Sequence, residues 1–241
     1  MKTDDLLLKG KTVITTHPVK GRDELVDILQ QSGIRVLQMP LIETVPCSFS
    51  LPKPLTFYDW IVFTSKNALQ PFFTKESHCN ARIAVIGNST SRALKKLGKQ
   101  ADFVGSGKSG GHFSRELQQV LHPADKVLLV LGKLAPAVLT NNLTKFCQVD
   151  RVNVYDTQMP SYIDTEVLKL IKSDAYDLIT VTSPSAVHHL IQLLHEAPDE
   201  MRLISIGEIT SAAIRQYGIE PVATAPTQTY REVARSVLNY F

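Results

Sequence analysis

Short apolar runs alternate with amphipathic segments along most of the chain. A run such as Trp60–Thr64 is apolar at nearly every position, which is typical of a strand buried on both faces of a sheet. The segment 22–32 instead places Leu25, Ile28 and Leu29 at helical spacing. Buried strands separated by amphipathic helices predict parallel sheets with helices on both faces.

The same pattern defines the other elements. The predicted strands are Thr12–Thr16, Ile34–Gln38, Trp60–Thr64, Ile83–Ile86, Asp102–Val104, Val127–Leu131, Val149–Tyr155, Leu178–Thr182, Leu203–Ile206 and Ile219–Ala223. The predicted helices are Arg22–Ser32, Lys66–Phe73, Thr90–Leu97, Phe113–Leu121, Pro136–Phe146, Asp164–Ile171, Ser185–Leu194, Ile209–Tyr217 and Tyr230–Tyr240. The fold class that follows is α/β, with flavodoxin-like or Rossmann-like parallel sheets.

One block of the pattern occurs twice. Residues 58–73, YDWIVFTSKNALQPFF, return as residues 176–191, YDLITVTSPSAVHHLI, and nearly the same offset carries 82–98 onto 202–218. Each copy has a strand ending in Thr-Ser, a helix, and a strand ending in Ile-Gly before a helix rich in hydroxyl residues. We therefore expect two copies of one fold, which can grip a single ligand from two sides.

The copies are not simply consecutive, because the piece that completes the second copy lies at the N-terminus. The N-terminal piece runs from KTVITTHPVKG to VLQMP. It corresponds to the piece that runs from KVLLVLGKLAP to VNVYD at the end of the first copy. The prediction is a discontinuous domain of residues 1–40 plus 160–241, with a second domain of residues 45–153 inserted in it. Segments 40–46 and 153–160 form the two connections, and their prolines and β-branched residues predict a short two-stranded hinge.

Composition changes this picture little. The chain has 241 residues, enough for two domains, and its 44% apolar and 20% charged content is that of a globular protein. A net charge of +3, scattered along the chain, does not indicate a nucleic-acid partner but suits an anionic small molecule. The three cysteines, Cys47, Cys79 and Cys147, lack the spacing of a zinc site and favour a reducing compartment.

The N-terminal sequence MKTDDLLLKG carries two aspartates where a signal peptide is basic, and its apolar stretch is only Leu6–Leu8. The run Val127–Leu131 is far shorter than a membrane span. We expect a cytoplasmic protein with no membrane partner.

The motifs of the repeat support a resemblance. TS-x-x-A followed by IG-x-x-T occurs twice, Val154-Tyr155-Asp156-Thr157 lies at the second connection, and TAPTQTYREVA occupies residues 224–234. Over essentially the whole chain, this order resembles the uroporphyrinogen-III synthase family. The resemblance implies a monomeric lyase that closes the linear tetrapyrrole hydroxymethylbilane into a ring. It inverts the last pyrrole and releases water, and it uses no cofactor or metal.

Two positions depart from the family pattern. An Arg-Pro pair is expected after the first strand, where this chain has His17-Pro18. An arginine is also expected after Gly132, where this chain continues with Lys133 and then Ala135-Pro136. Substrate contacts by arginine at these two places are therefore not expected here.

Hydroxyl residues gather at the predicted junctions from strand to helix. Helix N-termini offer unpaired N–H groups and a favourable dipole to an anionic ligand, and parallel sheets bind ligands at this edge. The alternative is that each hydroxyl only caps a helix. The candidate substrate-binding residues are Thr64, Ser65, Lys66, Asn67, Ser89, Thr90, Thr182, Ser183, Ser185, Thr210 and Ser211.

Tyr155 is the candidate for proton chemistry. A phenol at the junction of the two copies could donate a proton to the hydroxyl that leaves the substrate as water. The alternative is a tyrosine whose ring packs in the connection and whose hydroxyl is solvated. Most of the catalysis is expected to come from holding the two end rings in the right geometry.

Other motifs predict ordinary structural roles. GSGKSGG at 105–111 lacks the first glycine of a phosphate-binding loop and is expected to be a turn before a helix. His188, His189 and His195 lack the spacing of a metal site, and Lys95-Lys96 fits a solvated helix face. The remaining alternative for the whole chain is a non-catalytic, two-lobed sensor of a small molecule.

Overall fold

The computed structural model describes residues 8–18, 21, 23–76, 80–195 and 200–241. The chain divides into two compact units, unit 1 with residues 1–43 and 158–241 and unit 2 with residues 44–157. The predicted boundaries lie within a few residues of these, and independent folding of the inserted domain stays a prediction. Cys79 lies outside the described residues.

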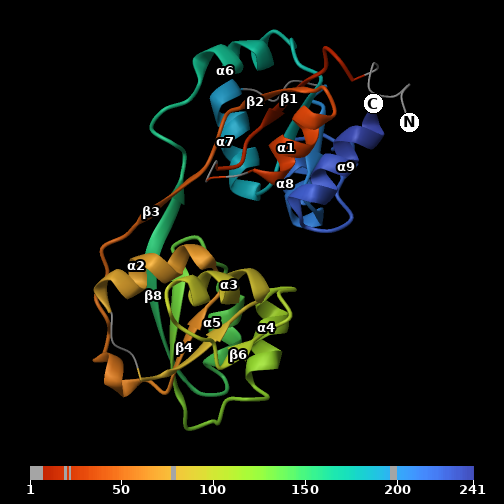
Figure 1. Cartoon of the computed structure of the whole chain (residues 1–241). Coiled ribbons are helices and arrows are strands. Elements are labelled where there is room, and N and C mark those ends of the chain that lie inside the picture. The colour runs from red at the N-terminus through yellow and green to blue at the C-terminus, as the bar shows by residue number, and fades with distance from the viewer. Residues whose placement is uncertain (1–7, 19–20, 22, 77–79, 196–199) are drawn as a thin grey trace. The chain divides into compact units, whose positions relative to one another are not determined.

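Unit 1 contains a five-stranded sheet in the order β11-β10-β9-β1-β2. Figure 1 labels β1 and β2 of this sheet and the helices of the unit. Its strands are β1 (Thr12–Thr15), β2 (Arg35–Gln38), β9 (Leu178–Val181), β10 (Leu203–Ser205) and β11 (Ala223–Thr224). All four neighbouring pairs are parallel, with Val13 opposite both Val36 and Leu178.

Helices cover both faces of this sheet. They are α1 (Glu24–Gln31), α6 (Thr165–Lys172), α7 (Pro184–Leu194), α8 (Glu208–Arg215) and α9 (Tyr230–Tyr240). On one face, Leu25 of α1 and Val233 of α9 pack against Val13. On the other, Leu190 of α7 and Ile214 of α8 pack against the sheet, together with the apolar side of α6.

Unit 2 contains a six-stranded sheet in the order β3-β8-β7-β4-β5-β6. Its strands are β3 (Glu43–Pro46), β4 (Trp60–Phe63), β5 (Arg82–Val85), β6 (Phe103–Val104), β7 (Lys126–Gly132) and β8 (Gln148–Gln158). The β3 segment lies beside β8, so both predicted connections continue strands of this sheet.

The helical elements of unit 2 are η1 (Leu55–Phe57), η2 (Lys66–Ala68), α2 (Leu69–Lys75), α3 (Asn88–Lys96), α4 (Gly110–Leu117) and α5 (Val138–Leu143). Phe72 of α2 and Leu94 of α3 pack on one face of the sheet. Phe113 of α4 and Leu139 of α5 pack on the other.

Strand for strand, the two sheets share one order. β11, β10, β9, β1 and β2 of unit 1 correspond to β6, β5, β4, β7 and β8 of unit 2. The sequence repeat assigns the same correspondence, with β1 taken from the N-terminus and β7 from the end of the first copy. The predicted α/β class is confirmed, with two sheets in which parallel pairing dominates.

Some element boundaries differ from the prediction. Of the strand predicted over Ile219–Ala223, only Ala223 is part of β11 (Ala223–Thr224), because Pro221 has no N–H to donate to a ladder. The helix predicted from Lys66 begins as the 3-10 turn η2, and Pro71 occupies the first turn of α2, where its missing N–H costs nothing. The helix predicted over Pro136–Phe146 is shortened to Val138–Leu143.

Candidate functional site

Ser65 and Ser183 occupy equivalent places after the central strands β4 and β9. Each caps the helical segment that follows: Asn67 N–H donates to Ser65 Oγ at 3.2 Å, and Ala186 N–H donates to Ser183 Oγ at 3.2 Å. Both side chains are half-buried. A serine oxygen that accepts such a bond keeps its own hydrogen for a ligand, so capping and binding are compatible.

Four other candidates lie inside a helix rather than before it. Helices α3 and α8 begin at Asn88 and Glu208, with Gly87 and Gly207 as their N-cap residues. Because the helices start earlier than predicted, the hydroxyl residues fall in the first turn. Ser89 is exposed, whereas Thr90, Thr210 and Ser211 are buried.

Ser211 belongs to a buried hydrogen-bond chain. Its Oγ lies 2.5 Å from Ser205 Oγ and 2.7 Å from Thr224 Oγ1. This chain ties α8 to β10 and β11. Ser211 therefore has a structural role, and its part in substrate binding stays a hypothesis.

The remaining predicted binding residues stay at the carboxyl edges of the two sheets. Lys66 is exposed, and the other four are half-buried: Thr64, Asn67, Thr182 and Ser185. The structure therefore groups them in two equivalent sets, one after β4 and one after β9.

Tyr155 lies on β8 where that strand runs beside the end of β7. A register shift occurs between Leu131, which pairs with Asn153, and Gly132, which pairs with Tyr155. The ring is half-buried and packs partly on the core beneath α2 and α3. A Cβ atom placed on Gly132 would lie 2.5 Å from Tyr155 Cζ and 2.8 Å from its hydroxyl oxygen. The phenol therefore rests directly on the backbone of Gly132.

Arg151 stabilises the end of β7 beside Tyr155, and it was not identified from the sequence. Its Nη2 donates to the carbonyl oxygens of Gly132 at 3.2 Å and Lys133 at 3.3 Å, and its Nε donates to Asn153 Oδ1 at 2.9 Å. Lys133 N–H donates to the carbonyl of Tyr155 at 2.9 Å. The end of β7 is therefore tied to β8 on both sides of the glycine.

His17 replaces the expected arginine in unit 1 and is 1% exposed. Its Nε2 lies 2.6 Å from Asp23 Oδ2, while Asp23 Oδ1 accepts the N–H groups of Leu25 and Val26 as the cap of α1. The ring of Tyr230 lies 4.6 Å from the His17 ring. Burial, with a contribution from Asp23, raises the pKa of Tyr230. His17 thus fastens β1 to two helices instead of presenting a cation to solvent.

Ala135-Pro136, the other departure, lines an apolar recess of about 240 Å³ at the carboxyl edge of unit 2. Thr64, Ile86 and Val138 share this recess. Val138 is 46% exposed, and the neighbouring Leu134 is 60% exposed. Where the family resemblance led us to expect a guanidinium, this chain offers an apolar surface.

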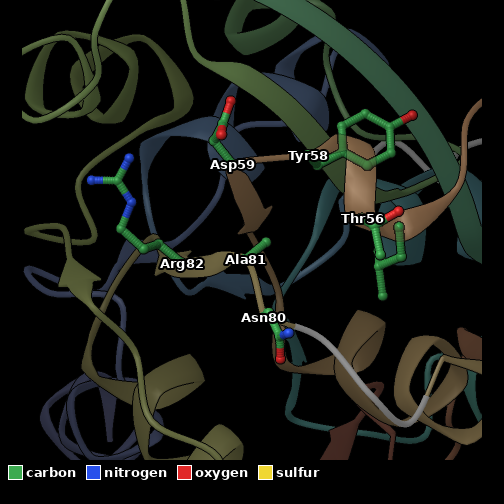
Figure 2. Close-up of a pocket in the computed structure, with 7 residues that line it drawn as sticks. Thr56, Tyr58, Asp59, Asn80, Ala81 and Arg82 are labelled. Carbon is green, nitrogen blue, oxygen red and sulfur yellow. The ribbon is translucent and has the colours of Figure 1, made fainter.

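A larger recess of about 500 Å³ lies at the opposite, amino edge of unit 2 (Figure 2). Figure 2 shows Tyr58 and Arg82 pointing in opposite directions there. Tyr58 donates to Asp150 at 2.8 Å, and Arg82 lies 4.3 Å above the Trp60 ring. Burial and Asp150 raise the pKa of Tyr58. Because these polar groups already serve the structure and parallel sheets bind ligands at the other edge, the carboxyl edge is the candidate site.

The other motifs have structural roles. In the glycine-rich loop, Ser109 caps α4 by accepting the N–H of His112, while Glu116 accepts the N–H of Ser106. The carboxylate of Glu116, on α4, thus lies against this loop and disfavours phosphate binding there. His188 Nδ1 lies 2.7 Å from Tyr217 Oη, and His189 Nδ1 lies 2.6 Å from the carbonyl of Leu41.

The prediction of a solvated helix face at Lys95 and Lys96 is met, since both are exposed. Cys147 is buried, and burial together with Asp125 raises the pKa of its thiol. Within the part of the chain that the structure describes, no three His, Cys, Asp or Glu side chains come together as metal ligands.

Comparison with known proteins gives one consistent result. A family model described as "Uroporphyrinogen-III synthase HemD" matches residues 23–233. The chain is 28% identical over 233 residues to a porphyrin biosynthesis protein HemD of Ruminiclostridium josui; the match covers 89% of this chain but only 46% of that protein. It is 26% identical over 209 residues to the uroporphyrinogen-III synthase of Synechococcus elongatus, covering 78% of this chain and 76% of that one.

A solved structure has the same fold. The uroporphyrinogen-III synthetase of Helicobacter pylori superposes with a TM-score of 0.67 at 17% identity, over 96% of this chain and all of that one. At 17% identity this similarity shows the fold alone, and membership of the family follows from the match to the family model.

Proposed function

Because the chain belongs to the uroporphyrinogen-III synthase family, we propose that it closes hydroxymethylbilane to uroporphyrinogen III. In this reaction the substrate loses its hydroxyl as water, and the terminal pyrrole ring is inverted. The observation that carries the proposal is the family match over residues 23–233, on a chain built of two like α/β units. The family consists of lyases of haem biosynthesis.

Tyr155 is assigned the role of proton donor. As the bond between the substrate methylene carbon and its hydroxyl oxygen breaks, the phenol proton passes to that oxygen, and water leaves. The half-buried ring on the bare backbone of Gly132 supports this assignment, because the hydroxyl stays close to a strand end where ligands of parallel sheets bind. The phenolate of Tyr155 is reprotonated when the newly closed macrocycle loses a proton.

Substrate carboxylates are assigned to the carboxyl edges of the sheets. The N–H groups at the starts of η2, α3, α7 and α8 supply neutral donors with a favourable dipole. Ser65 and Ser183 can add their hydroxyls. Thr90, Thr210 and Ser211 are buried and donate their own N–H groups to the carbonyls of Gly87 and Gly207, so they support these turns. Positioning rather than strong acid–base chemistry then decides which isomer forms.

The second candidate, a non-catalytic sensor, predicts binding without turnover. Enzymatically generated hydroxymethylbilane, incubated with the protein and separated by chromatography, distinguishes the two. Type III isomer in excess over the spontaneous type I supports the synthase. The same isomer ratio with and without protein would overturn it.

The proposal also keeps the expectations of a monomer acting on a small molecule in the cytoplasm, without nucleic acid. No helix among the described residues is long and apolar enough to cross a membrane. Light scattering coupled to size exclusion tests the monomer, for which a mass near 26.7 kDa is expected.

A further inference from the structure

We infer that Gly132 is a positioning residue that fixes the place of the Tyr155 phenol. The role rests on the proposed function of Tyr155 in proton donation. It is distinct from substrate contact, since Gly132 acts only through the ring that lies on it.

The contact itself is unusually specific. The three atoms nearest to a Cβ placed on Gly132 all belong to Tyr155: Cζ at 2.5 Å, Cε2 at 2.7 Å and the hydroxyl oxygen at 2.8 Å. Any side chain at residue 132 would occupy the volume of the catalytic end of the ring. The absence of a Cβ atom is therefore what allows the phenol to lie there.

Backbone conformation does not explain this glycine. Gly132 is absent from the positive-φ glycines, a group that includes Gly107 and Gly218, so an L-residue could adopt its conformation. Glycine inside a strand weakens that strand, and it commonly marks a close approach of another group. Here the group that approaches is the Tyr155 ring.

The backbone of Gly132 cannot easily retreat from a new side chain. Arg151 holds the carbonyls of Gly132 and Lys133, and Lys133 N–H holds the carbonyl of Tyr155. On its other side β7 pairs with β4 only as far as Val130, so the bonds to β8 are what hold Gly132. A methyl group on residue 132 therefore displaces the ring instead.

A double-mutant cycle tests the inference in the full chain. Gly132→Ala should lower kcat by about 30- to 100-fold, close to the loss for Tyr155→Phe, because both remove the same proton transfer. KM should change less than about threefold, since substrate-binding groups stay in place. The double variant should be no slower than Tyr155→Phe alone.

Gly111→Ala is the matched control. A Cβ atom there meets nothing within 4 Å, and the residue lies in α4 of the same unit. This variant should keep full kcat. Unchanged kcat in Gly132→Ala, or losses that multiply in the double variant, would overturn the inference.

A readout without catalysis separates this inference from the proposed function. With ring-labelled tyrosine, the NMR signal of Tyr155 should shift in Gly132→Ala and stay in place in Gly111→Ala. If Gly132→Ala fails to fold, adding Tyr155→Ala should restore folding, because the clash is then removed. An unmoved signal, or no rescue, overturns the inference. A wild-type chain that forms no type III isomer would instead overturn the proposed function.

Discussion

The ends of β1 and β7, which are corresponding strands of the two sheets, are closed in opposite ways. His17 follows β1 and is buried against Asp23 and beneath the Tyr230 ring. Gly132 ends β7 and carries the Tyr155 ring on its bare backbone. In unit 1 a buried imidazole stabilises the end of the strand. In unit 2 a glycine leaves room for the phenol of Tyr155.

The neighbouring strands β2 and β8 differ in length, because β2 ends at Gln38 and β8 continues to Gln158. In the sheet registers, Met39 after β2 corresponds to Val152 of β8, and both side chains are buried. Tyr155 lies further along β8 and is half-buried. Unit 2 therefore carries a polar side chain on a part of β8 that has no counterpart in β2. This difference favours unit 2 as the source of the proton donor.

The largest effect expected is on the stability of unit 1. Asp23→Ala removes the α1 cap and leaves His17 Nε2 buried without an acceptor, so the free energy of unfolding should fall by about 3 kcal/mol. Denaturant unfolding of the full chain measures it. Asp164→Ala, which removes only a cap from α6, should cost about 1 kcal/mol. Equal losses would mean that the contact with His17 contributes nothing.

The next effect concerns the phenol on the other side of the comparison. Tyr155→Phe should lower kcat by about 100-fold, because proton donation to the leaving hydroxyl is lost. The ring still packs on Gly132, so the unfolding midpoint should be unchanged. Product released by the enzyme should remain type III, since the inversion depends on how the substrate is held.

Wild-type turnover in this variant would remove Tyr155 from the chemistry. A shift to type I at an unchanged rate would make it a positioning group instead. Tyr162→Phe, at an exposed tyrosine, is the control and should leave both rate and isomer ratio unaltered.

A smaller effect is expected at the opposite ends of the same strands. Asp177 Oδ2 accepts Thr12 N–H and its Oδ1 accepts from Lys11 Nζ, while Asp59 Oδ2 makes the equivalent bond to Lys126 N–H. Burial acts to raise the pKa of Asp177, but the bonds from Thr12 and Lys11 outweigh it and the pKa is lowered.

A lowered pKa in the folded state means that Asp177 stabilises the protein above the ordinary pKa of an aspartate. This stabilisation is lost as the pH falls through the lowered value. Asp177→Asn should therefore cost about 1 kcal/mol at neutral pH and nothing in strong acid. Unfolding measured as a function of pH checks this; a loss independent of pH would contradict it.

The smallest effect is expected at the apolar recess. Ala135→Arg restores the type of residue that the family resemblance led us to expect, and one exposed charge contact should lower KM by about twofold to threefold. The gain should disappear at high salt. Gln119→Arg, an exposed position beyond the end of α4, should leave KM unchanged. An unchanged KM in both variants would show that substrate carboxylates do not approach the recess.

Local patterns predicted much of the fold. Continuous apolar runs such as Val127–Leu131 gave the buried strands, and Ser65 and Ser183 cap helical segments as their positions suggested. Thr90 and Thr210 were placed too near the helix start, because Gly87 and Gly207 serve as caps without a side-chain oxygen. Hydroxyl residues after a glycine do not reveal by themselves where the first turn begins.

The contacts around the candidate site depend on pairings distant in sequence. That Tyr155 lies on Gly132 follows from the register shift of β8, which no spacing in the sequence encodes. Similarly, the burial of His17 depends on Tyr230, more than two hundred positions along the chain. Sequence reasoning could name Tyr155 and note the missing arginines, but not what replaces them.

The sheet order of unit 1 also has a consequence during synthesis on the ribosome. β1 pairs with β2 soon after both emerge, but its other neighbour, β9, is made only after the whole of unit 2. At roughly 5–20 residues per second, the open side of β1 waits on the order of ten seconds or more. Unit 2 has all its strands in one continuous stretch and can close first. The nascent chain therefore carries an unfinished apolar sheet edge, and that edge is where we expect chaperones to bind.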